Sequence, residues 1–217
     1  MDKTKARKRA EELKEVINDY RYRYHVLDDP TVTDEIYDSL TRELRKIEEE
    51  YPELVTADSP TQRVGGKALS KFKSIAHQKP MLSLNDIFDT AELEAWEKRM
   101  HKLSGQTKLE YYVELKMDGL AMALQYEKGV FVRAITRGDG KVGEDVTHTV
   151  RTIETVPLRL RKSPKVPKEV YDFFEIRGEV ILPRKEFEKI NKQRAKEELP
   201  LFANPRNAGA GTIRQLD

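Results

Sequence analysis

The sequence predicts an α+β protein in which a helical hairpin precedes a mostly antiparallel domain. Apolar residues recur at the 3.6-residue spacing of a helix in residues 4–26, and again after a break. Residues 120–136 instead alternate or run apolar, as strands do. Between the two patterns, residues 52–80 hold several prolines, a Gly-Gly pair and little periodicity, which is typical of a connector. We therefore expect a helical subdomain at residues 1–65 and an α+β domain at residues 66–217.

The two helices of the expected hairpin are separated by a helix-breaking segment. Asp28-Asp29-Pro30 ends the first pattern, and Thr31 or Thr33 can cap the second helix at its N-terminus. Tyr51-Pro52 ends the second helix. The inward faces are expected to carry Ala6, Ala10, Leu13, Val16, Ile17, Tyr20 and Tyr24 on the first helix, and Ile36, Tyr37, Leu40, Leu44 and Ile47 on the second.

The second domain is expected to begin with a helix and to continue mainly as strands. The helix runs from about Thr90 to Leu103, and Asp89 with Glu92 can form its capping box. Its inward face is expected to consist of Leu93, Trp96, Met100 and Leu103. The pattern then predicts strands at 111–114, 120–126, 130–136 and 173–182, a tight turn at 127–129, a helix at 183–196, and a final loop that leads toward a helix.

Composition excludes several classes of protein. The chain has no cysteine, which rules out disulfides and cysteine-ligated zinc. No stretch approaches the roughly 20 apolar residues of a membrane span, and the N-terminus lacks the apolar run of a signal peptide, so we expect a cytoplasmic protein. Residues 1–65 carry 12 Lys/Arg against 16 Asp/Glu, whereas residues 66–217 carry 28 against 22. The basic second domain is therefore the better candidate for contact with phosphate, but on charge alone so small an excess favours an ordinary solvated surface.

The segment Glu114-Leu115-Lys116-Met117-Asp118-Gly119 joins the groups that an amine nucleophile needs. A lysine on a strand beside an apolar stretch is partly desolvated, which favours the neutral, reactive amine. Asp118 and Glu114 lie on the same face of such a strand, where Asp118 can orient the amine or help to hold a metal ion. Gly119 lets the backbone turn close to a ligand. The same pattern is also typical of a surface strand with mixed charges that ends in a turn.

Two further segments have the composition of ribose- or phosphate-binding loops. Residues 136–145 combine three glycines with Arg137, which suits close approach of the backbone to phosphate. In residues 175–180, Glu179 can accept hydrogen bonds from ribose hydroxyls or lie near Mg²⁺. A glycine-rich hairpin loop and a solvent-facing glutamate would give the same patterns.

Residues 204–214 combine small residues with Arg206 and Arg214, which favours close contact with a polyanion. An ordinary loop before a helix explains this segment equally well.

The hairpin adds a group of polar and aromatic side chains. These could stack on a base and bind a cationic ring and a ribose, although an aromatic stripe on a helix is usually core. This group consists of Tyr22, Tyr24, His25, Asp34, Tyr37 and Asp38.

Taken together, these segments resemble the bacterial NAD-dependent DNA ligases. The similarity runs from about Ala6 to Asp217. Several separate motifs in the right order are far more specific than a lone Lys-x-Asp-Gly. They are, in order, YRYHVLDDPTVTDEIYD, YPELVTADSPTQRVGG, HQKPMLSLNDIF, VELKMDGLAMALQYEKG, TRGDGKVGEDVT, RGEV and FANPRNAGAGTIRQLD.

The resemblance implies a nicotinamide-mononucleotide-binding hairpin followed by a nucleotidyltransferase core that is incomplete at its C-terminus. Lys116 would attack the α-phosphorus of NAD, form a lysyl-AMP phosphoramidate and expel nicotinamide mononucleotide, with support from Asp118. AMP would then pass to the 5′-phosphate of a nick in double-stranded DNA, and the 3′-hydroxyl would displace it. Mg²⁺ would neutralise the phosphate charge.

The resemblance also implies which residues contact the ligand. The nicotinamide mononucleotide would meet the hairpin at Tyr24, His25, Asp34, Glu35, Ile36, Tyr37 and Asp38. The adenine would meet Ser83, Leu84 and Glu114, and the ribose and phosphate would meet Arg137 and Glu179. Arg206 and Arg214 match positions that meet phosphate or DNA.

The sequence departs from the family pattern in length. Family members continue with a second lysine-bearing strand, an OB-fold, a zinc module, helix-hairpin-helix repeats and usually a BRCT domain. We therefore expect the chain to be part of a longer, monomeric protein, and its nick sealing to need that protein. The alternatives are an inactive nucleotide- or DNA-binding module, and an ATP-dependent relative, against which the hairpin argues.

Overall fold

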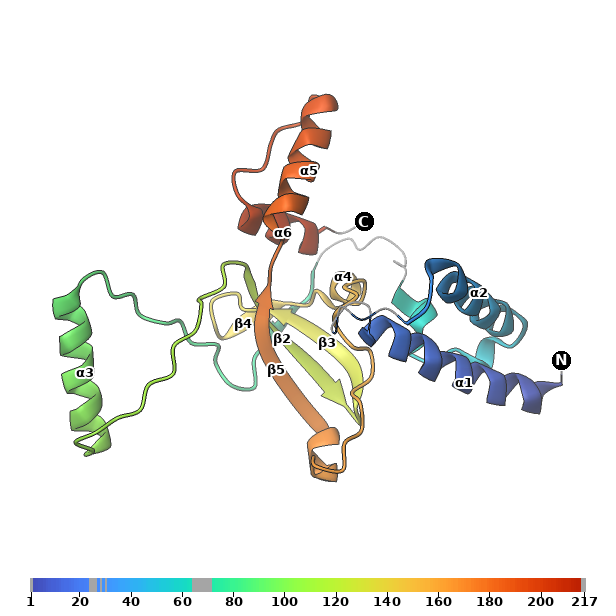
Figure 1. Cartoon of the computed structure of the whole chain (residues 1–217), viewed down its shortest axis with the longest axis horizontal. Coiled ribbons are helices and arrows are strands. Elements are labelled where there is room, and N and C mark those ends of the chain that lie inside the picture. The colour runs from blue at the N-terminus through green and yellow to red at the C-terminus, as the bar shows by residue number, and fades with distance from the viewer. Residues whose placement is uncertain (1, 24–26, 28, 30, 64–71, 216–217) are drawn as a thin grey trace.

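The computed structural model describes residues 2–23, 27, 29, 31–63 and 72–215, and it confirms the α+β class. A helical hairpin lies at one end of the long axis, a sheet in the middle and helix α3 at the other end (Figure 1). The helices are α1 (Lys3–Tyr22), α2 (Asp34–Glu50), α3 (Thr90–Ser104), α4 (Thr147–Val150), α5 (Arg184–Lys196) and α6 (Pro205–Ile213). The strands are β1 (Ser74–Ala76), β2 (Leu120–Glu127), β3 (Val130–Thr136), β4 (Val142–Glu144) and β5 (Phe173–Val180), and short 3₁₀ helices are η2 (Pro52–Leu54), η3 (Pro60–Arg63) and η4 (Lys168–Tyr171).

Helices α1 and α2 pack along the predicted stripe and form a core of their own. The buried residues are Ala6, Ala10, Leu13, Ile17, Leu44, Ile47 and Leu54. Thr33 occupies the N-cap of α2 without a side-chain capping hydrogen bond to the first turn, and Tyr51 ends the helix as predicted. Val16 and Ile36 are exposed, contrary to prediction. Each of the two points about 100° away, around the helix axis, from an adjacent residue that does pack. The contact between α1 and α2 is too narrow to cover both residues of such an adjacent pair.

The main sheet has the order β3-β2-β5, and both pairings are antiparallel. Lys128 and Gly129, with φ values of 51° and 74°, form the tight turn between β2 and β3 that the sequence predicts. One face packs on a core that includes Met122, Tyr126 and Phe131. A β-bulge interrupts the β2–β3 pairing at Gln125 and Tyr126. The opposite face of β2 carries the small residues Ala121 and Ala123; Ala123 is fully buried, and a cavity opens beside Ala121.

Residues 82–118, the α3 arm, extend away from the sheet and contradict two predictions. Helix α3 forms with Asp89 as its N-cap, but it has no buried residue, and Leu103 is 74% exposed. Residues 111–114 run extended without pairing as a strand. Helical spacing identifies an apolar face but cannot say what covers it, and a strand exists only where another strand supplies its hydrogen bonds.

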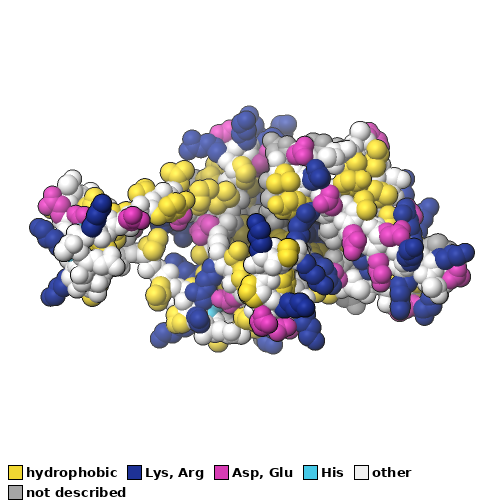
Figure 2. Space-filling view, turned by 60° about the horizontal axis from the view of Figure 1, so that its bottom comes forward, with side chains coloured by type: hydrophobic (Ala, Val, Ile, Leu, Met, Phe, Trp, Pro, Cys, Tyr) yellow, Lys and Arg dark blue, Asp and Glu magenta, His cyan; other side chains and the backbone are white. Residues whose placement is uncertain are grey.

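Apolar side chains gather on the neck that joins the α3 lobe to the body, as Figure 2 shows. They belong to the two extended segments of the α3 arm and are 76–89% exposed: Leu82, Leu84, Phe88, Tyr112, Val113 and Leu115. Such a row of large apolar side chains is unusual on a water-facing surface. The arm is therefore the part of the described structure whose apolar side chains have the least packing.

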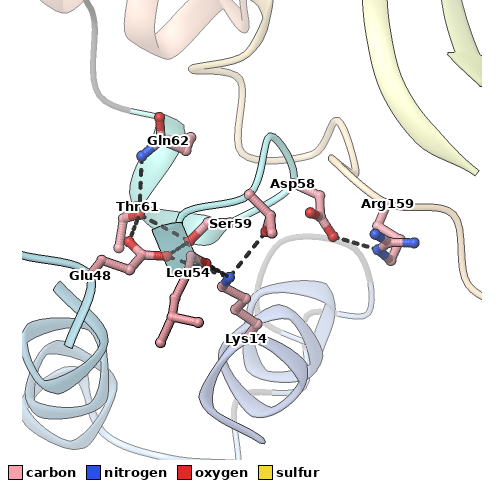
Figure 3. A network of polar contacts seen from close by, with 9 residues as sticks. Lys14, Glu48, Leu54, Asp58, Ser59, Thr61, Gln62 and Arg159 are labelled. Carbon is pink, nitrogen blue, oxygen red and sulfur yellow. Dashed lines mark hydrogen bonds and ion pairs between the residues drawn. The ribbon is translucent and has the colours of Figure 1, made fainter. Parts of the chain in front are cut away.

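A polar network joins the hairpin to the segment that follows it (Figure 3). The buried Glu48 carboxylate accepts hydrogen bonds from Ser59, at 2.6 Å, and from Thr61. Lys14 lies 3.6 Å from the same carboxylate and donates to the Leu54 carbonyl at 2.7 Å. These contacts hold residues 54–61 against both helices.

We expect Glu48→Gln to lower the free energy of unfolding by about 1–3 kcal/mol, because a buried amide replaces a carboxylate that satisfies two hydroxyl donors and a lysine. Urea denaturation measures the loss. Glu49→Gln, at an exposed neighbouring position on α2, is the control and should change stability by less than about 0.5 kcal/mol. Equal stabilities for the two variants would contradict the network's structural role.

Residues 58–63, which follow the hairpin, dock on the segment between α4 and η4. Arg63 is buried, which lowers the pKa of its guanidinium to about 10, and it donates to the carbonyls of Ile153 and Val156 at 2.8 and 2.7 Å. Arg159 pairs with Asp58, and burial alone would raise the pKa of that carboxyl. Hydrogen bonds from Arg159 and Thr56, together with the positive charge of Arg159, jointly outweigh burial, so the pKa of Asp58 lies below its ordinary value. The hairpin is thus attached mainly through polar contacts.

Candidate functional site

A cavity of about 910 Å³ opens on the side of the sheet that carries Ala121. Its lining brings together residues far apart in the sequence. Five of the lining side chains are cationic, namely Lys116, Arg137, Arg177, Arg206 and Arg214, and three are anionic, namely Glu114, Glu144 and Glu179. A cationic majority in a concave site favours a ligand that carries phosphate.

One wall of the cavity begins at the strap, which we define as residues 77–81. Its first residue is fixed by hydrogen bonds from the His77 backbone N–H to the Lys141 carbonyl, at 2.8 Å, and between His77 Nε2 and the Thr136 carbonyl, at 3.1 Å. The Met81 N–H donates to the Gly140 carbonyl at 2.8 Å. Ser83 and Leu84 follow the strap directly and line the cavity. The strap therefore sets where these two residues stand.

Arg137 connects this wall to the glycine-rich loop. Its guanidinium donates to Ser83 Oγ at 3.3 Å. Two backbone N–H groups, from Val142 and Lys141, donate to the Asp139 carboxylate at 2.8 Å each, and these bonds lower the pKa of that carboxyl. Gly138 has φ of 56°, and a Cβ there would collide with the Val142 carbonyl oxygen. The loop is thus a tight turn, and only glycine can occupy position 138 in it.

The floor of the cavity is the face shared by β2 and β5. Glu179 and Arg177 stand opposite Ala121 and Ala123 in the antiparallel register, so small residues of β2 face charged residues of β5. Gly119 precedes β2, and a Cβ there would collide with the Val180 carbonyl oxygen. The close approach predicted at Gly119 is therefore to a neighbouring strand, β5, of the same chain.

Lys116 lines the cavity but is exposed, because it lies on the returning segment of the α3 arm. The prediction that an apolar strand desolvates Lys116 is wrong for this structure. Its neighbours Leu115 and Met117 are themselves 86% and 49% exposed, so they exclude little water from the amine.

Helix α6 contributes two arginines that are paired with acidic residues of the site. Arg206 donates to Asp118 at 3.3 Å, and Arg214 lies 2.7 Å from Glu144. Both arginines are exposed, and exposed ion pairs contribute little to stability. These arginines can therefore exchange a carboxylate for a phosphate at small cost.

The structure does not bring the hairpin residues to the cavity. Among the described residues predicted to meet nicotinamide mononucleotide, Glu35, Ile36, Tyr37 and Asp38 belong to α2 and are absent from the cavity lining. The Tyr37 hydroxyl accepts a hydrogen bond from Arg21 at 3.0 Å. Only the backbone of Asp34, at the start of α2, is described, and Tyr24 and His25 lie outside the described residues.

Most of the predicted site residues of the second domain do meet in one place. Ser83, Leu84, Glu114, Lys116, Arg137, Glu179, Arg206 and Arg214 line the cavity, and Asp118 pairs with one of them. The sequence did not predict Arg177, Glu144 or the strap as parts of the site. Arg177 had a usable signal, since it lies two residues from Glu179 and so on the same face of a strand.

This fold and cavity define a class of protein: an α+β domain with a cationic cavity suited to a phosphate-bearing ligand, preceded by a helical hairpin. The family description "NAD-dependent DNA ligase adenylation domain" matches residues 69–217, and "DNA ligase-like, N-terminal NAD+-binding domain" matches residues 3–65. The chain belongs to the NAD-dependent DNA ligase family.

Curated relatives agree with this assignment. The chain is 52% identical to a DNA ligase of Thermomicrobium roseum, over 97% of this chain and 30% of the relative. It is 50% identical to a DNA ligase of Koribacter versatilis, over 97% of this chain and 31% of the relative. The chain thus spans about 30% of the length of these relatives. Among the described residues, no helix is both long and apolar enough to cross a membrane.

Proposed function

We propose that the chain accepts AMP from NAD⁺ as part of a DNA ligase, with residues 1–65 as the nicotinamide-mononucleotide-binding subdomain and residues 66–217 as the nucleotidyltransferase domain. One observation carries the proposal: Lys116 lines the same cationic cavity as Ser83 and Glu179, although the three come from separate parts of the chain. The matching NAD⁺-binding and adenylation domains support it.

In the proposed reaction, the neutral amine of Lys116 attacks the α-phosphorus of NAD⁺. An N–P bond forms, the P–O bond to nicotinamide mononucleotide breaks, and the leaving group takes the electron pair. The lysine nitrogen releases its proton to solvent. Arg137 and the α6 arginines Arg206 and Arg214 would balance the phosphate charge, while Ser83, Leu84 and Glu114 would contact adenine, and Glu179 the ribose.

Mg²⁺ is proposed as the metal of this reaction, where it would neutralise phosphate charge. Among the described residues, no group of three or more His, Asp or Glu side chains could hold a metal ion. Mg²⁺ usually keeps several waters and binds through one or two carboxylates together with substrate phosphates. Glu179, in the cavity wall, and Asp118 are the carboxylates that would join those phosphates.

The hairpin is proposed to bind the nicotinamide half of NAD⁺. Its excess of acidic residues suits a cationic pyridinium ring and disfavours a triphosphate. Since the α2 residues lie away from the cavity, the proposal requires the hairpin to approach it when NAD⁺ binds. Some of the polar contacts that attach the hairpin are exposed, such as Arg161 with Asp19 on α1 at 2.8 Å, and exposed ion pairs can exchange for others.

Intact mass after incubation with NAD⁺ and Mg²⁺ tests this function directly. We suggest measuring both the chain and a chimera in which residues 1–217 replace the matching region of the Thermomicrobium roseum relative. The chimera should gain the mass of one AMP with NAD⁺ and not with ATP. No AMP adduct on the chimera would overturn the proposal, and an adduct from ATP alone would indicate an ATP-dependent relative.

A second candidate function is a nucleotide- or DNA-binding module without activity of its own. The exposure of Lys116 favours this for the isolated chain, because an amine surrounded by water is not oriented for attack. The chain by itself should then adenylate poorly and seal no nicks. The chimera, by contrast, should both adenylate itself and seal nicks. We propose nicked DNA as the partner, and a cytoplasmic monomer as the working form, of the longer protein.

A further inference from the structure

A line of polar side chains crosses the sheet on its cavity side and ends at the strap. Arg133 on β3 lies 3.5 Å from Gln125 on β2, and Gln125 donates to Glu175 on β5 at 2.9 Å. Glu175 in turn accepts a hydrogen bond from Arg177 Nε at 3.0 Å. Gln125 is only 4% exposed, so this line is a built part of the sheet.

Arg177 joins this line to the strap. Its guanidinium donates to the Pro80 carbonyl at 2.9 Å and to the Lys79 carbonyl. The small side chain of Ala123, opposite Arg177 in the register, leaves room for the arginine to reach across. A planar guanidinium that donates to two successive carbonyls fixes both the position and the direction of that backbone.

The strap is therefore held from both sides. His77 and Met81 attach it to the loop that follows β3, and Arg177 attaches it to β5. Ser83 lies only two residues after Met81, the last residue of the strap. Large side chains of the α3 arm that follow are highly exposed. The orientation of Ser83 and Leu84 thus depends on where the strap is held.

We propose that Arg177 is a positioning residue for the adenine wall: it fixes the strap and thereby the residues that contact the base. The inference rests on the proposed function for the identity of the ligand, but not for the ordering of the strap. Arg177 also lines the cavity, so its action through the strap carbonyls is judged by the ordering of the strap in the absence of nucleotide.

Hydrogen exchange without nucleotide tests the ordering. In the 217-residue chain, Arg177→Ala should speed amide exchange in residues 77–84 by about tenfold or more, whereas Arg133→Ala should leave it unchanged. Arg133 is a matched control because it lies at the far end of the same line and touches no strap residue. Arg177→Lys should give an intermediate rate, since an ammonium lacks the planar fork. Wild-type exchange rates in Arg177→Ala would overturn the proposal.

Binding of AMP and of nicotinamide mononucleotide, measured by calorimetry on the same variants, tests the effect on the wall. Arg177→Ala should raise the Kd for AMP about tenfold and leave that for nicotinamide mononucleotide unchanged, which a general loss of folding would not do. Unchanged AMP affinity in Arg177→Ala would overturn the role at the adenine wall. If the wild-type chain bound neither ligand, the proposed function would fail. The exchange rates would still decide whether Arg177 orders the strap.

Discussion

Replacement of Lys116 by alanine or arginine in the chimera is expected to abolish AMP transfer from NAD⁺, with a loss of roughly 10⁴-fold or more. Alanine removes the nucleophile, and arginine keeps a cation in the cavity but stays protonated and is a poor nucleophile. The measurement is the initial rate of AMP incorporation followed by intact mass. The arginine variant separates nucleophilicity from charge.

Lys108→Ala is the matched control, because Lys108 is exposed on the same returning segment of the α3 arm and does not line the cavity. Its rate should equal that of the unmodified chimera. Peptide mapping should place AMP on Lys116, and an adduct mapped to any other lysine would refute the assignment. A loss of rate in Lys108→Ala as large as in Lys116→Ala would point instead to a disturbed arm.

The second large effect is expected in the hairpin. Asp38→Ala in the chimera should slow reaction with NAD⁺ by roughly 10²-fold, because an exposed carboxylate that could balance the pyridinium charge is lost. Sealing of a nick by enzyme that already carries AMP should be nearly unchanged, since nicotinamide mononucleotide has then left. The two steps are measured separately, the first by mass and the second on a labelled nicked duplex.

Ser39→Ala, at the next exposed position of α2, is the control and should leave both steps unchanged. Tyr37→Phe keeps the half-buried ring and removes only the hydroxyl that accepts a hydrogen bond from Arg21, so it tests the neighbouring position without opening the hairpin core. If Asp38→Ala slowed both steps equally, the hairpin would be a structural support and not part of the NAD⁺ site.

Local patterns in the sequence predicted the elements that depend on local contacts. The α1–α2 hairpin follows from its apolar stripe, and the β2–β3 hairpin follows from alternation around Lys128 and Gly129. Helix α3 forms where its capping residues indicate, since Asp89 accepts a hydrogen bond from the Glu92 N–H. In each case the deciding interactions lie within a few residues or across one short turn.

Features that depend on distant partners were not predictable in this way. The strand expected at 111–114 fails because a strand needs a neighbour, and the inward face of α3 fails for the same reason. The pairing of Arg206 with Asp118 joins residues 88 positions apart, and that of Arg177 with the Pro80 carbonyl spans 97. Residue types marked both arginines as polar groups, but only the fold shows which carbonyl or carboxylate each one meets.

The strand order β3-β2-β5 also determines how the sheet can assemble in time. Strands β2 and β3 are joined by two residues and can pair within microseconds, whereas the pairing of Glu127 with Phe173 must close a loop of the intervening chain. We therefore expect β5 to dock last during refolding, and after β2 and β3 during synthesis on the ribosome. Glu179 and Arg177 arrive with β5, so refolding followed by the fluorescence of tyrosines such as Tyr126 on β2, and in parallel by AMP binding, should show a sheet that forms before it can recognise a nucleotide.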